Sequence, residues 1–307
     1  MSRSPRGLYI ETFIRAPLDA VWRHTQQPDE HQRWDLRFSE IRYLPRERAE
    51  APQRFLYATR IGFGLAIRGE GESTGTRHAD DGTATSALRF HSDDPWSLIA
   101  EGSGYWRYVP EADGVRFFTW YDYRTRFGVV GRVIDQFVFR PLMGWATAWS
   151  FDRLRRWLEE GTPPEVSRRV ALAHAIARLG QVFTFAYHGL VPKLLGPHAD
   201  ELAMLADAGV PPEQRTLAVV VIGVAELLYA GVLLVAWRAR WPALLSLVAM
   251  FVATLSVGLS SPRFLGAAFN PVSLNLLVMA LAGIDLLTSP LTPSARRCAR
   301  SPRPEPR

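Results

Sequence analysis

The sequence predicts two unlike parts: an α+β unit, in which an antiparallel sheet surrounds a long C-terminal helix, followed by an all-α four-helix transmembrane bundle. Two observations predict this division. Residues 7–160 alternate short β-type segments with turns and end in a long helical pattern. From Thr216 to Pro290, by contrast, the only charged residues are Glu226, Arg238, Arg240, Arg263 and Asp285. The overall composition, 48% hydrophobic with a net charge of +6, averages these two parts.

We expect four segments along the 307 residues: a soluble domain at 7–160, a linker at 161–169, a membrane domain at 170–288 and a disordered basic tail at 289–307. The linker contains Pro163-Pro164, which predicts a short, semi-rigid connection. The tail is rich in Pro, Ser and Arg, a composition typical of disorder. Met1–Phe13 has no apolar run of signal-peptide length, so we expect the soluble domain in the cytosol.

The elements of the soluble domain follow from local patterns. Tyr9–Arg15 is expected to form the first strand, and two short helices follow, the first beginning at Ala16 and the second covering Pro28–Asp35. Turn-rich separators then divide up to six β segments: Ile41–Leu44, Arg54–Ile61, Gly64–Gly69, Thr85–His91, Ser97–Val109 and Val115–Arg126. The apolar stripe of Gly128–Glu160 predicts a long helix with a kink at Pro141.

Alternation along the last β segment indicates that one face of the sheet is covered. Phe117, Thr119, Tyr121 and Tyr123 share one face, although Phe118 and Trp120 interrupt the charged face. Six aromatic residues are therefore candidates to line a space between the sheet and the long helix: Trp34, Tyr57, Tyr121, Tyr123, Trp145 and Trp149. Aromatic side chains with a polar tip suit an apolar ligand that needs one or two hydrogen bonds.

Candidate catalytic residues are hard to find. The single cysteine, Cys298, excludes a disulfide framework and a thiolate metal site. The sequence has no Gly-rich phosphate loop, no nucleophile elbow and no His/carboxylate set at metal spacing, so we predict no metal and no cofactor. His91-Ser-Asp-Asp is a weak acid–base candidate, because the neighbouring Pro95 and Trp96 favour a solvated turn. Arginines interspersed with acids argue against nucleic-acid binding.

Four apolar stretches predict four transmembrane helices: Ala171–Leu195, Leu217–Trp237, Trp241–Ser260 and Pro271–Leu287. Polar residues such as His174, Arg178 and Gln181 interrupt the first stretch. We expect it to span, with these residues facing the bundle interior or lying near an end; a helix lying on the membrane surface is the alternative. Arginines concentrate before the first span, between the second and third, and in the tail, so both termini are expected on the cytoplasmic side of the plasma or inner membrane.

Three polar residues, His188, Lys193 and Glu226, form a candidate site in the membrane part. Glu226 lies near the middle of the second span, where a charge costs several kcal/mol unless it is paired or protonated. It is either a proton-bearing or substrate-facing carboxylate or an interhelical anchor, and His188 lies at a depth that could meet it. Lys193 is expected to extend to the outer head groups, and Arg178 and Asp285 to form an ion pair between helices.

Both parts resemble known families. Residues 7–160 have the helix-grip order of elements, and the opening Ile10–Trp22 with Trp34-Asp35 resembles the START-like (SRPBCC) superfamily of polyketide cyclases and lipid carriers. The resemblance implies a cavity for apolar small molecules between sheet and helix. Arg178, Gly189–Leu195, Glu226-Leu-Leu and Asn270-Pro resemble the DoxX-like family of four-helix membrane proteins, some of which are associated with quinone-linked or thiol-stress redox complexes.

Together these features predict a membrane-tethered cytosolic module that binds a hydrophobic small molecule, lipid-like or quinone-like, beside the lipid bilayer. Two alternatives remain open. The protein could be an enzyme or redox-complex accessory acting on a hydrophobic substrate as a cyclase or dehydratase does, with Glu226 and His188, or His91 and Asp93, moving protons. It could also be a membrane scaffold that recruits a partner subunit.

Overall fold

The computed structural model describes residues 7–46, 48, 51–62, 64–268 and 270–302, and the chain divides into two compact units. The first unit combines the chain up to Ser167 with the segment that begins at Pro293, and the second runs from Arg168 to Thr292. The second unit is therefore an insertion in the first. The first boundary between the units, between Ser167 and Arg168, lies within the helix Pro164–Gly189.

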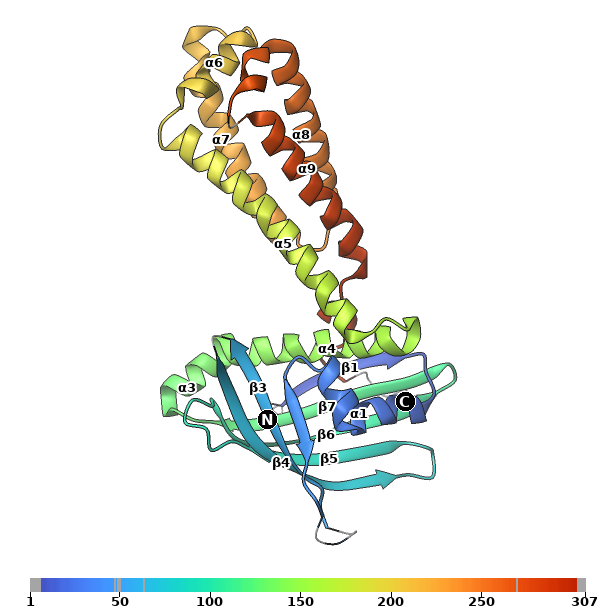
Figure 1. The fold of residues 1–307 in the computed structure, drawn as a ribbon. Helices are drawn as coiled ribbons and strands as arrows, with labels where there is room; N and C mark the ends of the chain where they lie inside the picture. Colours follow the sequence, from blue (N-terminus) through green and yellow to red (C-terminus); the bar gives the residue numbers. More distant parts are fainter. Residues whose placement is uncertain (1–6, 47, 49–50, 63, 269, 303–307) are drawn as a thin grey trace. The chain divides into compact units, whose positions relative to one another are not determined.

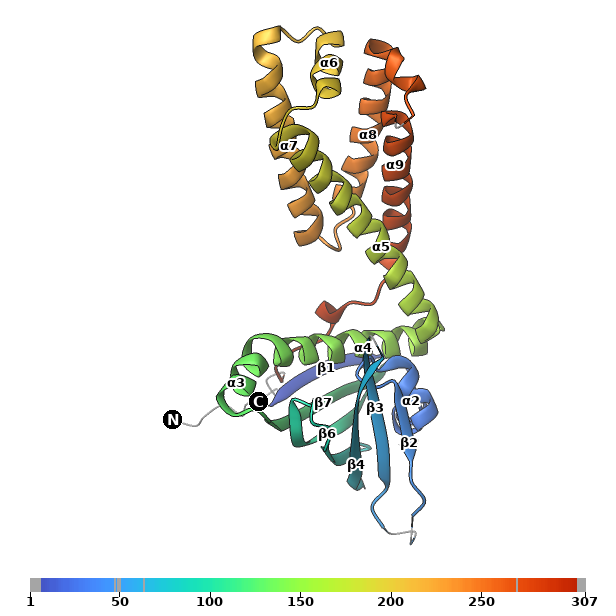
Figure 2. The same ribbon diagram turned by 60° about the vertical axis from the view of Figure 1, so that its left-hand side comes forward.

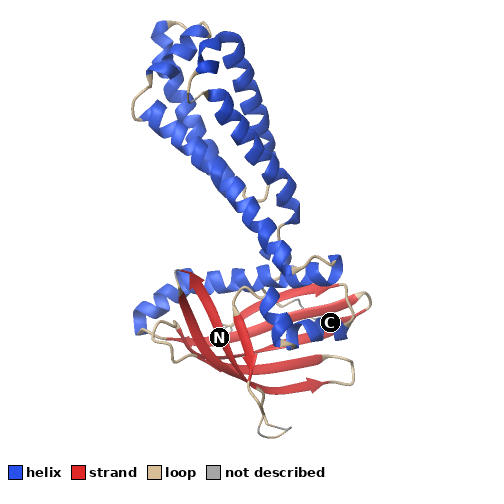
Figure 3. Ribbon diagram, viewed as in Figure 1, coloured by secondary structure: helices blue, strands red, loops and turns tan. Residues whose placement is uncertain are grey.

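A seven-stranded antiparallel sheet with strand order β1-β7-β6-β5-β4-β3-β2 forms the centre of the first unit (Figures 1 and 3). Two short helices, α1 (Leu18–Gln26) and α2 (Pro28–Trp34), connect β1 to β2. The strands are β1 (Leu8–Ile14), β2 (Glu40–Tyr43), β3 (Arg54–Gly62), β4 (Leu65–His78), β5 (Ala84–His91), β6 (Ile99–Glu111) and β7 (Gly114–Thr125).

The expected long helix is present, but it is divided into three parts. These are α3 (Gly128–Ile134), a π-helical turn η1 (Asp135–Phe139) and α4 (Arg140–Glu160). Pro141 lacks the N–H that would continue the α-helical ladder, and a π turn before a proline accommodates that missing bond. The predicted kink at Pro141 thus takes the form of a π turn.

The core of the first unit lies between α4 and the sheet. Ile10, Phe117, Phe151 and Leu154 are fully buried there, and Trp34 joins them from α2. Burying an apolar side chain of this size contributes about 1.5–3 kcal/mol. α4 runs along the sheet, above β1 and β7, in both ribbon views (Figures 1 and 2). This arrangement is the helix-grip fold predicted from the sequence.

The alternation predicted for β7 is confirmed. Phe117, Thr119, Tyr121 and Tyr123 are all buried. The interruption at Phe118 and Trp120 also has an explanation, because a second aromatic cluster covers the other face of this part of the sheet. Tyr9 lies 5.4 Å from Phe118 and Tyr105 lies 6.1 Å from Trp120, measured between ring centroids.

The prediction of a disordered tail is wrong for the described residues up to Pro302. After the short turns η4 (Ser289–Leu291) and η5 (Ala295–Arg297), Ala299 pairs with Glu11 of the edge strand β1 through two backbone hydrogen bonds of 3.0 and 2.9 Å. The N–H of Ser294 donates to Asp152 of α4 at 2.7 Å, and Cys298 is buried. An edge strand has unpaired backbone N–H and C=O groups, and the C-terminal segment forms hydrogen bonds with those of β1. The composition of the segment does not reveal that it pairs with a strand so far away in the sequence. Residues 303–307 lie outside the described part.

The second unit is helical. Its main helices are α5 (Pro164–Gly189), continued by the π turn η2 (Leu190–Leu194), α7 (Pro212–Val235), α8 (Trp241–Ser260) and α9 (Pro271–Thr288). The shorter elements are α6 (Ala199–Asp207) and η3 (Pro262–Gly266). In the described chain, three helices are long and apolar enough to cross a membrane: α7, α8 and the segment that begins with α9. The expected fourth span, α5, is not among them by hydropathy, because polar residues lower its average.

In α5 the polar residues are buried and the large apolar residues are exposed, the reverse of a surface helix in a soluble protein. His174, Arg178 and Gln181 are almost fully buried in the second unit. The exposed face carries large apolar residues: Leu172, Ile176, Leu179, Phe183 and Tyr187. Polar residues turned inward and apolar residues turned outward suit a helix surrounded by lipid.

Candidate functional site

The inner face of the sheet, the face turned toward α4, carries aromatic rings that lie flat over glycines of the neighbouring strand. Tyr57 on β3 is paired with Gly69 on β4, and a Cβ on Gly69 would lie 2.3 Å from the Tyr57 hydroxyl. The same relation holds for Phe55 with Gly71 and for Phe90 with Gly102, according to the strand register and the 2.3 and 2.4 Å approaches. A glycine inside a strand typically marks such a close approach.

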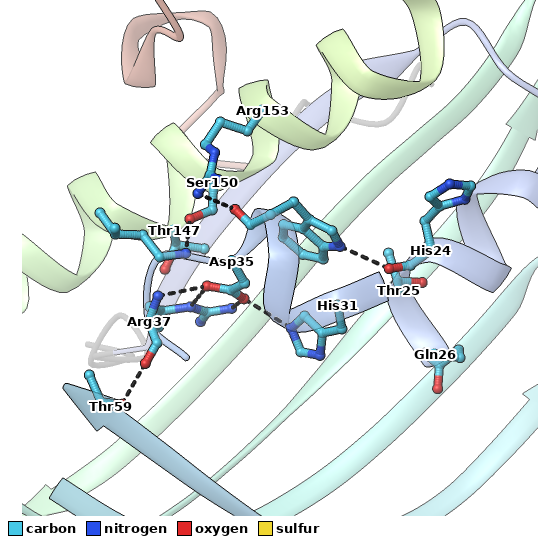
Figure 4. A network of polar contacts seen from close by, with 12 residues as sticks. His24, Thr25, Gln26, His31, Asp35, Arg37, Thr59, Thr147, Ser150 and Arg153 are labelled. Carbon is cyan, nitrogen blue, oxygen red and sulfur yellow. Dashed lines mark hydrogen bonds and ion pairs between the residues drawn. The ribbon is translucent and has the colours of Figure 1, made fainter. Parts of the chain in front are cut away.

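A buried ion pair lies between α2, β2 and α4 (Figure 4). The guanidinium of Arg37 donates to both oxygens of Asp35, at 2.9 Å from Nε and 2.6 Å from Nη2. His31, one helical turn before Asp35, contacts the same carboxylate at 3.0 Å. The Asp35 side chain is 0% exposed and that of Arg37 10% exposed, so both charges lie almost wholly away from water.

The segment that holds this ion pair is fixed to α4 by further hydrogen bonds. The N–H of Leu36 donates to Ser150 at 2.8 Å. Arg153 donates to the carbonyl of Trp34 at 3.0 Å and to that of Pro164 at 2.9 Å. Thr59 of β3 donates to the carbonyl of Arg37 (Figure 4). The pair is therefore held between the long helix and the sheet.

The charges of this cluster cancel. Burial would raise the pKa of Asp35, but the nearby guanidinium of Arg37 and the hydrogen bonds from His31 and Arg37 lower this pKa below its ordinary value. Burial lowers the pKa of His31, and this outweighs the opposite influence of Asp35. At neutral pH the cluster thus holds one anion, one cation and a neutral imidazole. A further unpaired charge beside this buried ion pair would cost more free energy than an uncharged polar group in the same place.

Three of the six aromatic residues predicted to line the interior are on the inner face. The Tyr121 hydroxyl lies 3.0 Å from Thr147 Oγ1 of α4, and Arg37 stands over the Tyr121 ring at 5.5 Å. The Tyr123 hydroxyl donates to Asp135 of η1 at 2.6 Å. Tyr57 lies 5.7 Å from the Phe38 ring, and burial raises the pKa of Tyr57 to about 12. The three hydroxyl groups are thus polar tips on an otherwise apolar face of the sheet.

The other three predicted lining residues occupy different positions. Trp34 is 0% exposed within the core, and its indole N–H donates to the carbonyl of His24 at 2.8 Å. Trp145 and Trp149 are stacked on each other with centroids 6.1 Å apart. They lie on the side of α4 away from the sheet, because residues two apart in a helix point in nearly opposite directions and Thr147 faces Tyr121. The apolar stripe of the helix could not reveal which aromatic residues face the sheet.

His91-Ser-Asp-Asp forms a turn at the end of β5. Asp94 accepts from the N–H of Arg68 at 3.4 Å and from that of Trp96 at 3.0 Å, which fixes the loop. The Asp93 side chain is 94% exposed. A pocket of about 460 Å³ beside this turn is lined by the predicted site residue Tyr57 and its strand partner Gly69, together with residues of β3 and β4 that alternate with them: Leu56, Ala58, Arg68 and Glu70. The solvated-turn interpretation thus accounts for this cluster.

The membrane candidates His188, Lys193 and Glu226 are brought together in a different way from the one expected. Lys193 Nζ lies 3.2 Å from Glu226 Oε2 and 3.0 Å from Glu201 Oε1 of α6. Lys193 is buried, so the prediction that it extends toward lipid head groups is wrong. Its orientation follows from the π turn at Pro192 and from the contact between Gly189 and Gly223, whose backbones approach so closely that a Cβ on Gly189 would lie 2.6 Å from the Gly223 carbonyl. The expected partner of Glu226, His188, contributes its carbonyl, 3.4 Å from Lys193 Nζ.

The predicted ion pair between Arg178 and Asp285 is present, with Nε and Oδ2 3.2 Å apart. His174 and Gln181 also contact this carboxylate, at 3.0 and 3.1 Å. Arg178 donates to the carbonyl of Ala239 at 2.7 Å, beyond the end of α7. The cluster therefore joins α5, α9 and the α7–α8 turn. In the described residues, no group of three or more His, Cys, Asp or Glu residues could hold a metal ion.

Sequence reasoning does not find the buried cluster around Asp35. In the sequence Asp35 is notable only as the neighbour of Trp34, and no motif marks Arg37, His31 or Asp135 as site residues. A signal was available: His31 and Asp35 are one helical turn apart, and Arg37 follows directly after the helix. Charged residues at the end of a short helix are usually solvated, so only the structure distinguishes these three.

The architecture defines a class of protein: an integral membrane protein that carries a helix-grip domain. Residues 182–283 match the DoxX-like family. The chain is also 44% identical, over 185 residues, to a Bacillus subtilis (strain 168) protein described as the uncharacterized membrane protein YndG; the match covers 60% of this chain and 69% of that protein. The chain belongs to the family of this membrane protein.

Solved structures are similar in fold to about half of the chain. The STAR-related lipid transfer protein from Xanthomonas axonopodis is 17% identical, with 51% of this chain and 96% of that chain covered and a TM-score of 0.38. The di-domain ARO/CYC protein StfQ from the steffimycin biosynthetic pathway is 14% identical, with 50% of each chain covered and a TM-score of 0.40.

Proposed function

We propose that the protein is a membrane-tethered binding module for a hydrophobic small molecule, lipid-like or quinone-like, held between the sheet and α4 of the first unit. The observation that carries the proposal is the chemistry of the inner face. Aromatic rings offer an apolar surface, the tyrosine hydroxyls offer a few polar contacts, and the buried Asp35–Arg37 pair fixes the segment that contacts Tyr121. Binding sites for small molecules combine these two features.

The polar groups of the inner face support binding rather than acid–base catalysis. Both oxygens of Asp35 accept from Arg37, and Asp135 accepts from Tyr123 and Arg140. A general base needs an acceptor that can reach a substrate proton, and these carboxylates already have protein partners. We therefore place binding before an enzymatic or scaffold function.

The test is to purify the full chain in nanodiscs of defined lipid and to analyse extracted small molecules by mass spectrometry. The full chain is required because residues from Pro293 onward are part of the first unit. We expect an apolar molecule, distinct from the nanodisc lipid, in stoichiometric amount. The double variant D35L/R37M should lose it. The control R54M/E70L removes an exposed pair, 2.9 Å apart, on the other face of the sheet and should retain it.

Two outcomes would contradict this proposal. One is the absence of any molecule other than the added lipid. The other is equal retention by D35L/R37M and by the control R54M/E70L, which would show that the bound molecule lies elsewhere in the chain.

We further propose that the second unit crosses the membrane four times, with α5 as the first crossing and both chain termini in the cytoplasm. The connection of the chain supports this topology. Both ends of the second unit continue into the first unit, which lies on one side of the membrane, so the number of crossings must be even. Three helices are apolar enough to cross, and α5 supplies the fourth crossing. The outward apolar face of α5 and the arginines at the ends of the unit support the same assignment.

Cysteine labelling in intact cells tests this topology. Glu213→Cys, at the start of α7, should react with a membrane-impermeant maleimide. Ser103→Cys, on the exposed outer face of β6, should react only after permeabilisation. The wild-type chain is the blank, because its single cysteine is buried. Reaction of both positions from the same side would rule out an odd number of crossings between them.

A further inference from the structure

An exposed apolar stripe follows the end of β7. Val129, Val130, Val133, Ile134, Phe137 and Val138 recur at helical spacing through α3 and η1, and each is between 45% and 71% exposed. Leu142 and Trp145 of α4 continue this α3 stripe, with 53% and 45% exposure. A soluble domain rarely leaves so many large apolar side chains in one continuous patch without a partner.

The charged residues around the α3 stripe are arranged asymmetrically. Asp135 is the only acidic residue between Arg126 and Phe151. It is 7% exposed and bonds inward, to Tyr123 of β7 and to Arg140. Arg132, by contrast, is exposed on α3. Asp122 of β7, the nearby part-exposed acid, is paired with Arg140 at 3.3 Å. The outward residues from Arg126 to Phe151 thus combine apolar side chains with positive charge.

The corner between β7 and α3 fixes the orientation of the stripe. Phe127 has a left-handed backbone with φ of 64°, which is uncommon for a bulky residue and reverses the chain sharply. Gly131 lies against the end of β7, and a Cβ there would lie 1.7 Å from the carbonyl oxygen of Arg126. α3 is therefore held closely to the strand, with its apolar residues outward.

We propose that the α3 stripe inserts into the interfacial region of the bilayer that contains the second unit. Apolar residues with arginine on one helix and a tryptophan at the margin are typical of helices that lie in a membrane interface. The first unit is covalently connected to the second at Ser167–Arg168 and again at Thr292–Pro293, and this double tether gives the stripe a high effective concentration near the lipid surface. Arg132 and the pairing of the nearby acids with arginine favour anionic head groups.

The experiment uses the full chain, reconstituted in vesicles of phosphatidylcholine with a minor fraction of phosphatidylglycerol. Val130→Cys is labelled with an environment-sensitive fluorophore, and Val138→Cys serves as a second position should the first impair folding. We expect a blue-shifted emission and several-fold stronger quenching by lipids with a doxyl group on the acyl chain than in the control, Ser103→Cys. Wild type reports background labelling, since Cys298 is buried.

Either of two results would overturn the proposal. The stripe stays in water if the labels at positions 130 and 138 have the same emission wavelength and the same weak quenching by doxyl lipids as the label at position 103. A blue-shifted label that doxyl lipids do not quench would show that protein, from the same or another copy of the chain, covers the stripe. Neither result bears on ligand binding by the inner face, which the nanodisc extraction tests independently.

Discussion

At the residue scale, the Asp35–Arg37 pair makes the strongest prediction. Breaking a buried ion pair leaves one charge without compensation and costs about 3–5 kcal/mol, whereas replacing both partners by apolar residues is often neutral. We expect Asp35→Asn to destabilise the first unit strongly. Arg37→Met in the same background should recover most of the loss. Thermal unfolding of the full chain, followed by tryptophan fluorescence, measures both.

Additive losses in that double-mutant cycle would contradict the buried pair. The exposed pair Arg54–Glu70 supplies the matched control. Both of its side chains are largely exposed, and double-mutant cycles of such surface pairs give about 0.2–1 kcal/mol.

The stability of the first unit is also expected to fall in acid in two steps. The pKa of His31 is lowered, chiefly by burial, so the contribution of this residue is complete above its ordinary value near 6.5 and is lost as pH falls below it. The pKa of Asp35 is lowered as well, against the effect of burial and because of Arg37 and His31, so its contribution is lost only below about pH 3.8. Melting temperatures measured from pH 8 to pH 3 should show both steps.

His31→Asn should remove the first step and leave the second. A stability profile that is flat between pH 7 and pH 5 in the wild-type protein would contradict the assignment of a neutral, buried imidazole.

At the scale of elements, the crossing of α5 and α7 depends on two glycines. A Cβ on Gly223 would lie 2.8 Å from the carbonyl oxygen of Gly189 and 2.8 Å from Lys193 Cβ, whereas nothing lies within 4 Å of a Cβ on Gly231 of the same helix. Gly223→Ala should therefore cost about 1–3 kcal/mol, the usual range for overpacking. Gly231→Ala is the matched control and should be neutral. Thermal stability in detergent, measured as monodisperse protein that remains after heating, separates the two.

The C-terminal segment makes a second prediction at this scale. Ending the chain after Thr292 removes the backbone pair between Ala299 and Glu11 and the bond from Ser294 to Asp152. At about 1 kcal/mol for each lost hydrogen bond, the first unit should melt several degrees lower. Ending the chain after Pro302 keeps these contacts and is the control. Equal melting temperatures for the two truncations would contradict a structural role for the segment.

The reactivity of the Cys298 thiol tests the packing of the C-terminal segment in the full chain, without truncation. Burial raises the pKa of Cys298 to about 12, ahead of a smaller effect of Asp152, so the thiol should react slowly with a maleimide in the folded protein. Arg300 donates to the carbonyl of Gly144, which fixes the segment to α4. Arg300→Ala should therefore increase the labelling rate of Cys298.

At the scale of the whole molecule, the sequence predicted the architecture better than the site. The helix-grip order, the division between soluble and apolar parts and the inner face of β7 all follow from local periodicity. The position of Trp145 and Trp149 and the buried pair at Asp35 and Arg37 depend on which face of a helix meets the sheet. The binding of the C-terminal segment to β1 depends on residues almost 290 positions apart, which no local pattern encodes.

The closing of the first unit by its C-terminal segment has a consequence for biosynthesis. The ribosome completes the helices of the second unit before it releases the residues that pair with β1, so the first unit can reach its final state only after these helices have been synthesised. A chain that stalls or is cleaved late in synthesis would present an open strand edge to chaperones and proteases. Folding of the first unit is in this way coupled to synthesis of the second unit, which lies between its two parts in the sequence.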